Sequence, residues 1–575
     1  MPFETLPDAP RASFLGLPLE MRQQIYLQYF TIEGGYIYDA ESDKLVQANR
    51  CSIDLSLRRV CRTIAIETYD YPLTLNKITF STAYRRDWRK KAAMFEIITT
   101  YHFRLLGAML KRLRHCLTPD MYKTPPTQHD SRYMSVVAKS ISDTIDLETR
   151  HPEFNADSNA NGYMLDFKAG RGFKDDGGDL SRPSGNDNNI SSNRAYTYLL
   201  QQIATQSPEK FREGIDDFLP GWAQSKSNPT SDFFELGFDF WAISSMREIT
   251  DMIKDLQLEE RWDQLDLWRY SEYLKEGYTG TRYCYQHKHF FSAAALAIHF
   301  LKSMSQTQRL LITKLILNED RMAVGNPECH IIGLIPFTKE NPHLFIEHRV
   351  NLWRNIIPRS CEESRFRSFP TRNESIIEPS EDDLDQHQVY HAYASQTICR
   401  FIMHTLESLR EGLPPNSYSV IFDGQPELNH STETFRYLME IQIAWLTAYT
   451  DCVAHGVLAP PENKTYPFQT CPSTTDTVSI QDRSSIIQCN FTLDQPWSYR
   501  EIAGDNDDNI EGRDSVHDVM RDFDIDEDYL DFDKLHVSNG KVDWMQIQGE
   551  FFETRPRSGL PEVETKVLDH RGLKE

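Results

Sequence analysis

Two groups of potential metal ligands occur in the middle of the chain, at Cys284-x-x-His287-x-His289 and at Cys329-His330. Thiolate and imidazole groups are the ligands that tetrahedral zinc prefers. No CxxC pair anchors either group, so ordinary packing of these side chains is the favoured interpretation and zinc is the alternative. We therefore predict that the protein holds no metal and no cofactor.

A second candidate metal site is the acidic run 522–533, whose aspartates have the spacing of an EF-hand loop. Glu527 stands where the sharp turn of such a loop needs glycine, and the twelfth position is Asp533 rather than glutamate. We interpret the run as a solvated acidic segment. The chain also contains no P-loop, GxSxG, HExxH or GxGxxG motif, so we expect an interaction protein and not an enzyme.

The stretch 76–115 has the opposite charge, with ten Lys and Arg against Asp87 and Glu96. Aromatic side chains such as Tyr84 and Trp88 lie among the cations, and this combination can bind single-stranded nucleic acid. The favoured interpretation is a basic helix whose apolar side chains point into the core, so a nucleic-acid partner is not expected.

Charge is distributed unevenly over the 575 residues, whose net charge is −23. Residues 501–575 carry 21 acidic and 9 basic groups, or about half of this charge. We hypothesise that this acidic tail folds back onto the basic stretch 76–115. The N-terminus has no secretory signal, and the longest near-apolar run, 290–301, is too short to span a bilayer, so we expect a cytoplasmic or nuclear protein without membrane contact.

Composition divides the chain into four regions. They are a module at 1–118, a polar and disordered insertion at 119–194, a helix-rich interaction domain at 195–500 and the acidic tail at 501–575. The predicted fold class is α+β with helix predominant and with short strands.

Local signals predict individual elements within these regions. The strands are expected at 78–80, 313–317, 418–422 and 486–493, with a β-hairpin at 34–46. The helices are expected at 53–64, from Pro208, at 291–304, at 388–411 and at 431–455, with a capping box at Ser305 and Gln308.

The motif with the most information lies near the N-terminus. Pro18 suits the first turn of a helix, Glu20 is favourable at the positive end of the helix dipole, and Met21, Ile25 and Tyr29 then share one helix face. The complete pattern is Leu17-Pro18-x-Glu20-x-Arg22-x-x-Ile25-Tyr26, then Leu57-x-x-Val60-Cys61-Arg62 with Glu67, then Asn76-x-x-Thr79-Phe80. Without a family context it predicts a capped amphipathic helix.

This pattern resembles the F-box-like N-terminal module of a large and mostly uncharacterised group of filamentous-fungal proteins. Segments at 300–309, 315–320, 327–330 and 333–337 resemble the same group. The resemblance implies a substrate adaptor, in which the module docks on the Skp-type adaptor of a cullin-based ubiquitin ligase and a separate domain recruits a protein substrate. It also implies that Leu17, Pro18, Ile25 and Tyr26 contribute to the adaptor-facing or core surface of the module.

Two features differ from an ordinary F-box. The hairpin at 34–46 has no place in a compact three-helix module, and Arg22 stands where an apolar residue is more usual. The alternative hypothesis is therefore a scaffold or nucleic-acid-associated factor that keeps the F-box-like fold without docking on a ligase, and the hairpin is the feature that discriminates between the two.

Overall fold

The computed structural model describes residues 13–122, 189–258, 283–360, 391–436, 486–492 and 549–556, with isolated residues between 134 and 150 and short pieces at 269–270, 388–389, 438, 535–536 and 547. Several predictions lie wholly or mostly outside these residues. They are the insertion at 119–194, the second half of the helix at 431–455, the acidic run 522–533 and most of the tail at 501–575.

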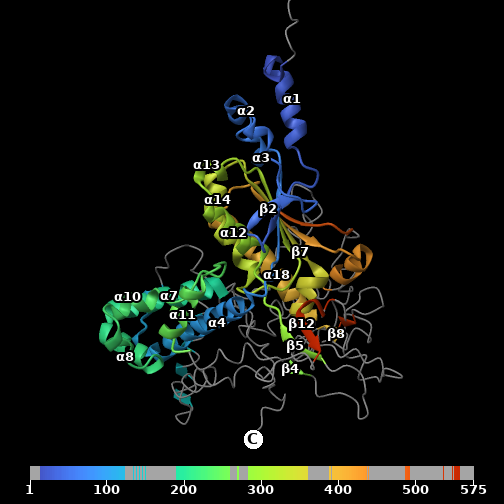
Figure 1. Ribbon diagram of the computed structural model, residues 1–575. Coiled ribbons are helices and arrows are strands. Elements are labelled where there is room, and N and C mark those ends of the chain that lie inside the picture. Colours follow the sequence, from blue (N-terminus) through green and yellow to red (C-terminus); the bar gives the residue numbers. More distant parts are fainter. Residues whose placement is uncertain are drawn as a thin grey trace, which may run out of the picture.

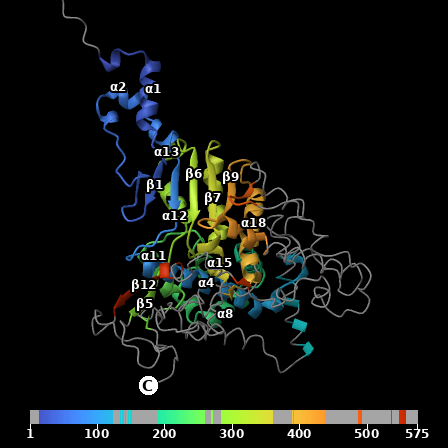
Figure 2. The same cartoon turned by 90° about the vertical axis from the view of Figure 1, so that its right-hand side faces the viewer.

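The centre of the described chain is a seven-stranded sheet (Figures 1 and 2). Its strands, in spatial order, are β10 (Ile487–Cys489), β9 (Tyr418–Asp423), β7 (Phe345–Asn351), β6 (Lys314–Glu319), β3 (Ile78–Ser81), β1 (Tyr36–Asp39) and β2 (Lys44–Gln47). Every neighbouring pair is parallel except β1 and β2, which form an antiparallel hairpin at the edge. The fold is therefore mixed α/β, and the α+β prediction with only short strands understated its sheet.

The connections between parallel strands contain helices, because a parallel pair needs a long crossover between its strands. The elements around the sheet are α12 (Ala293–Ser303), α13 (Gln306–Arg309), η7 (Pro327–Leu334), α14 (Ile335–Glu340), η8 (Leu352–Ile356), α15 (Ile357–Ser360) and α18 (His391–Arg410). A further helical layer lies below the sheet in Figure 1 and contains α4 (Arg89–Arg112), η3 (Arg114–Cys116), η4 (Pro119–Tyr122), α7 (Asn189–Gln206), α8 (Pro208–Phe218), α9 (Trp222–Ser225), α10 (Pro229–Phe234) and α11 (Met246–Asp255).

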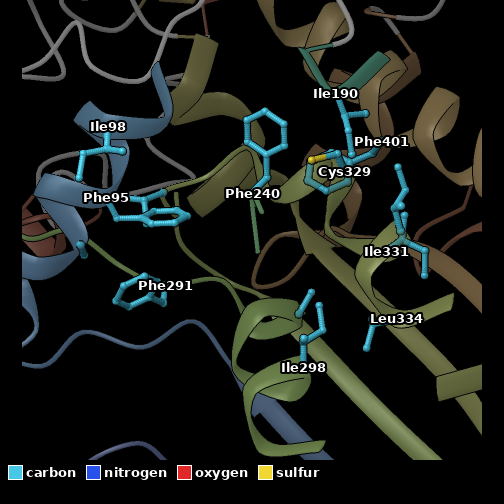
Figure 3. Packing of buried hydrophobic residues seen from close by; sticks show 14 of the residues in the cluster. Phe95, Ile98, Ile190, Phe240, Phe291, Ile298, Cys329, Ile331, Leu334 and Phe401 are labelled. Atoms are coloured by element: carbon cyan, nitrogen blue, oxygen red, sulfur yellow. The ribbon is translucent and has the colours of Figure 1, made fainter. Parts of the chain in front are cut away.

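One hydrophobic core joins the sheet to both sets of helices. In Figure 3, Phe95 of α4 faces Phe291, and their ring centroids are 6.1 Å apart. The same core continues through Ile298 of α12 to Leu334 of η7 and Phe401 of α18. The ranges 1–118 and 195–500 therefore share a core and a sheet, since β3 pairs with β6.

Two small sheets complete the described strands. One contains β4 (Arg269–Tyr270), β5 (Tyr283–His287) and β12 (Phe552–Pro556), and the other pairs β8 (Gln388–Val389) with β11 (Leu535–His536). No helix in the described ranges has both the length and the apolar character needed to cross a membrane.

Most of the local predictions are confirmed. The hairpin, the strands at 78–80, 313–317 and 418–422 and the capping box of Ser305 and Gln308 are all present. The helix expected over 388–411 is α18, which begins three residues later because Gln388 and Val389 form strand β8. Gly412, with φ of +93°, follows the helix as expected for a C-terminal glycine. The helix expected over 53–64 is wrong in its extent, because this stretch forms the single turn η2 (Leu57–Arg59) before α2 (Arg62–Glu67).

Candidate protein-interaction site

A small group of helices protrudes from the amino-terminal edge of the parallel strands (Figures 1 and 2). We call it the helical module and define it as residues 13–32 and 53–76. It contains η1 (Phe14–Gly16), α1 (Leu19–Phe30), η2, α2 and α3 (Tyr71–Thr74). The intervening hairpin leaves the module and pairs with β3 at the edge of the sheet. The hairpin therefore lies outside the packed helices of the module.

The module has a core of its own, separate from the main one. Tyr26, Phe30 and Ile64 are its buried centre. Tyr71 closes it from α3, with ring centroids 5.9 Å from Tyr26 and 6.2 Å from Phe30. Because these contacts connect α1, α2 and α3, the module is a packed unit and not a set of independent helices.

Arg22 and Glu67 explain two of the polar positions in the motif. The Arg22 guanidinium donates to both carboxylate oxygens of Glu67, at 2.6 and 3.1 Å, and the Tyr26 hydroxyl donates to the same carboxylate at 2.7 Å. Arg22 also donates to the carbonyl of Leu17 at 2.6 Å. These hydrogen bonds lower the pKa of Glu67, while burial raises the pKa of Tyr26 to about 12. Arg22, which departs from the F-box pattern, therefore holds α1 against α2.

Asn76 explains a third motif position, at the junction with the sheet. Its side-chain amide donates to the carbonyls of Phe30 and Pro72, at 2.7 and 3.0 Å, and its carbonyl accepts from the amide of Ile32 at 2.8 Å. The side chain is buried, so it satisfies backbone groups that water does not reach. Asn76 thus fixes the end of α1 to α3 just before β3 begins.

Helix α1 has two stripes with helical spacing. The stripe toward the module's core is Arg22, Tyr26 and Phe30, whereas the neighbouring stripe contains Met21 and Ile25, which are 53% and 42% exposed. The sequence predicted Met21, Ile25 and Tyr29 as one helix face, and of these only Tyr29 packs against the core. The stabilising face of α1 is therefore partly polar, and an apolar stripe remains in contact with solvent.

The four residues predicted to form the interaction surface differ in their exposure to solvent. Pro18 and Ile25 are exposed and Leu17 is half-buried, so all three are accessible to a partner. Tyr26 is fully buried and bonded to Glu67, so it supports the module from within and does not form part of the accessible surface.

Sequence reasoning missed most of the exposed apolar side chains. Nine large hydrophobic side chains are exposed in the described ranges, and seven of them belong to the helical module. These seven, which we call the apolar surface, are Leu15, Leu19, Met21, Ile25, Val60, Ile66 and Tyr69. Single exposed apolar residues need no explanation, but such a concentration on one small protruding unit makes the helical module the candidate interaction site.

Two of the residues considered for zinc, Cys329 and His330, have other roles in the fold, while the side chain of Cys284 lies outside the described part of the chain. His330 is buried, with Nδ1 2.6 Å from the Ser292 hydroxyl and Nε2 2.5 Å from the Gly325 carbonyl oxygen, and burial lowers its pKa to about 4. Cys329 is buried in the main core. Across the described part of the chain, no three or more His, Cys, Asp and Glu side chains are grouped to hold a metal ion.

Part of the basic stretch is also buried within the fold. Arg89, Lys91 and Arg114 are buried, and burial lowers the pKa of Lys91 to about 8. Lys91 lies over the Trp88 ring, 4.4 Å from its centroid. The predicted inward positions Phe95, Ile98 and Leu105 of this helix are confirmed as core residues.

No family model, curated protein or solved structure matches this chain. The fold and the candidate site themselves define the class of this protein. It is a mixed α/β protein that carries a protruding helical module with an apolar surface.

Proposed function

We propose that the protein is an intracellular, non-enzymatic adaptor whose helical module is F-box-like and docks on the Skp-type adaptor of a cullin-based ubiquitin ligase. The rest of the chain would then recruit a protein substrate. The observation that carries this proposal is the apolar surface on a unit that has its own core and stands clear of the sheet.

The motif contains residues that stabilise the module and other residues that remain exposed, and this separation supports the proposal. Arg22, Tyr26, Glu67 and Asn76 are occupied in holding the module together, whereas Ile25 and its apolar neighbours contribute little to the core. A helix stripe of apolar residues without an internal partner is typical of a docking surface. The hairpin, which argued against an F-box-like module, belongs to the sheet and leaves the helices free to dock.

The alternative as a nucleic-acid-associated factor is less well supported. Its candidate surface was the basic stretch 76–115, and several of the cations there are buried or paired within the fold. A net basic and accessible face is what binding to phosphates requires.

Affinity purification tests the proposal. Tagged wild-type protein is expected to recover Skp and cullin subunits, and Leu17→Ala/Pro18→Ala is expected to lose them. Leu310→Ala is the matched control, because Leu310 is an exposed apolar residue outside the module. If the wild-type protein recovers no Skp or cullin subunit, or if both variants behave alike, the adaptor role is wrong.

A further inference from the structure

At the opposite end of the sheet, the C-terminal segment (residues 549–556) lies against parts of the chain that are distant in sequence (Figures 1 and 2). Its strand β12 pairs antiparallel with β5, with Phe552 opposite His287 and Thr554 opposite Tyr285. The amide of Lys288 donates to the carbonyl of Phe551 at 2.8 Å and continues the ladder. The segment is therefore bound as an added strand.

Two carboxylates of the segment bind cations from distant parts of the chain. Glu550 lies 2.6 Å from Arg321 and 3.3 Å from Arg354. Glu553 accepts a hydrogen bond from Tyr84 and lies 3.8 Å from Arg86. The contacts of Glu553 agree with the expectation that the acidic C-terminal region meets the basic stretch 76–115.

These cations occupy a position where α/β sheets commonly bind ligands. Arg86, Arg321 and Arg354 follow the carboxyl ends of β3, β6 and β7, three neighbouring parallel strands. In open α/β sheets, ligands bind outside the carboxyl ends of the strands. In this protein the groups at that edge are occupied by the chain's own acidic segment.

Aromatic side chains complete the contact. Phe551 and Phe552 are both buried. The Phe551 ring lies 5.9 Å from Phe290, and the Phe552 ring lies 4.3 Å from His287. The site therefore offers a strand edge, two positions for aromatic rings and cations on either side of them. These are the features that bind an extended peptide.

We propose that β5 and the arginines at the carboxyl edge form a peptide-binding slot, which the C-terminal segment occupies as an internal competitor. The external ligand is an extended segment of a partner protein with two adjacent aromatic residues flanked by carboxylates, like Glu550-Phe551-Phe552-Glu553. Main-chain pairing gives such complexes affinity and side-chain pockets give them specificity. If the proposed function is right, the ligand belongs to the substrate that the adaptor recruits. Peptide binding itself does not depend on the proposed function.

The peptide is favoured over a nucleic acid because of β5. A polyanion could pair with the arginines, but it has no backbone that extends a β-ladder and no flanking pair of phenyl rings. The ion pairs are only partly shielded from water, so screening by water and salt weakens their attraction. The charges therefore set register and selectivity, while the strand and the rings supply most of the affinity.

The test uses the full chain and a fluorescein-labelled peptide with the sequence of residues 546–557, followed by fluorescence anisotropy. Phe551→Ala/Phe552→Ala in the chain should release the internal competitor and strengthen peptide binding at least about tenfold over the wild-type chain, because an attached segment competes at a high effective concentration. Glu550→Gln/Glu553→Gln removes only the ion pairs and leaves both rings in place, so it should release the segment to a smaller extent. The control peptide carries the two alanines and should not bind.

A charge exchange identifies the slot itself. Arg321→Glu in the released chain should weaken binding of the native peptide, and a peptide with Glu550→Lys should restore it. Equal peptide binding by the wild-type and both released chains would overturn the proposal. Stronger binding of a single-stranded oligonucleotide by the released chains, without stronger peptide binding, would also overturn it. Neither measurement uses a ligase component, so failure here is distinct from failure of the adaptor proposal.

Discussion

Acidification should destabilise the fold through His330, a buried imidazole near the carboxyl edge of the sheet. Burial lowers its pKa from 6.5 to about 4, so the folded protein keeps this side chain neutral while the unfolded chain protonates it. The unfolded state therefore binds more protons between these two pKa values, and stability falls as the pH decreases through this range. From pH 7 to pH 5 the loss from this single group is about 2 kcal/mol.

Urea denaturation followed by circular dichroism, at pH 7 and pH 5, measures this effect. His330→Gln is the matched variant, because an amide keeps one acceptor and one donor but does not titrate. The contributions of all other groups cancel in the comparison. We expect the wild-type protein to lose about 2 kcal/mol more than the variant on acidification. The same pH dependence in both proteins would refute the assignment of a neutral, buried His330.

Three further predictions concern packing and backbone geometry, each measured as the free energy of unfolding in urea. Phe80→Ala removes a fully buried ring from strand β3 and should cost about 3–5 kcal/mol, and a loss under about 1 kcal/mol would contradict its place in the core. Asn76→Ala leaves the Ile32 amide and the Phe30 carbonyl without their side-chain partner and should cost about 1–3 kcal/mol; full stability would mean that water replaces the side chain. Gly325→Ala should destabilise by more than about 1 kcal/mol, because φ is +80° and an added Cβ would lie 2.2 Å from a backbone oxygen; a neutral effect would exclude this conformation.

Short-range signals accounted for much of the secondary structure. The hairpin, the capping box of Ser305 and Gln308 and the glycine after α18 follow from residues close together in sequence. The parallel sheet could not be predicted in this way, because β3 and β6 pair across more than two hundred intervening residues and neither strand contains information about its neighbour. For the same reason the pairing of the C-terminal segment with β5 could not be predicted, since these two strands are also far apart in sequence.

The site was predicted in part. The motif coincides with the start of α1, where Pro18 precedes the helix and Ile25 lies within it, and both side chains are exposed. Periodicity could not decide which stripe of α1 faces the core, since the buried stripe begins with Arg22, a residue that pattern reading assigns to solvent. Only its hydrogen bonds to Glu67 reveal why a charged residue occupies the inner face.

We propose above that the apolar surface of the helical module docks on a Skp-type adaptor. Isothermal titration of the purified adaptor against the wild-type chain and against Leu19→Ala/Met21→Ala/Ile25→Ala tests it directly. These three side chains are 43%, 53% and 42% exposed, so burying their remaining surface contributes about 1 kcal/mol each. We expect the wild-type protein to bind and the triple variant to bind about 100-fold more weakly, at unchanged folding stability. No binding by the wild-type protein, or equal affinity of the two, would contradict it.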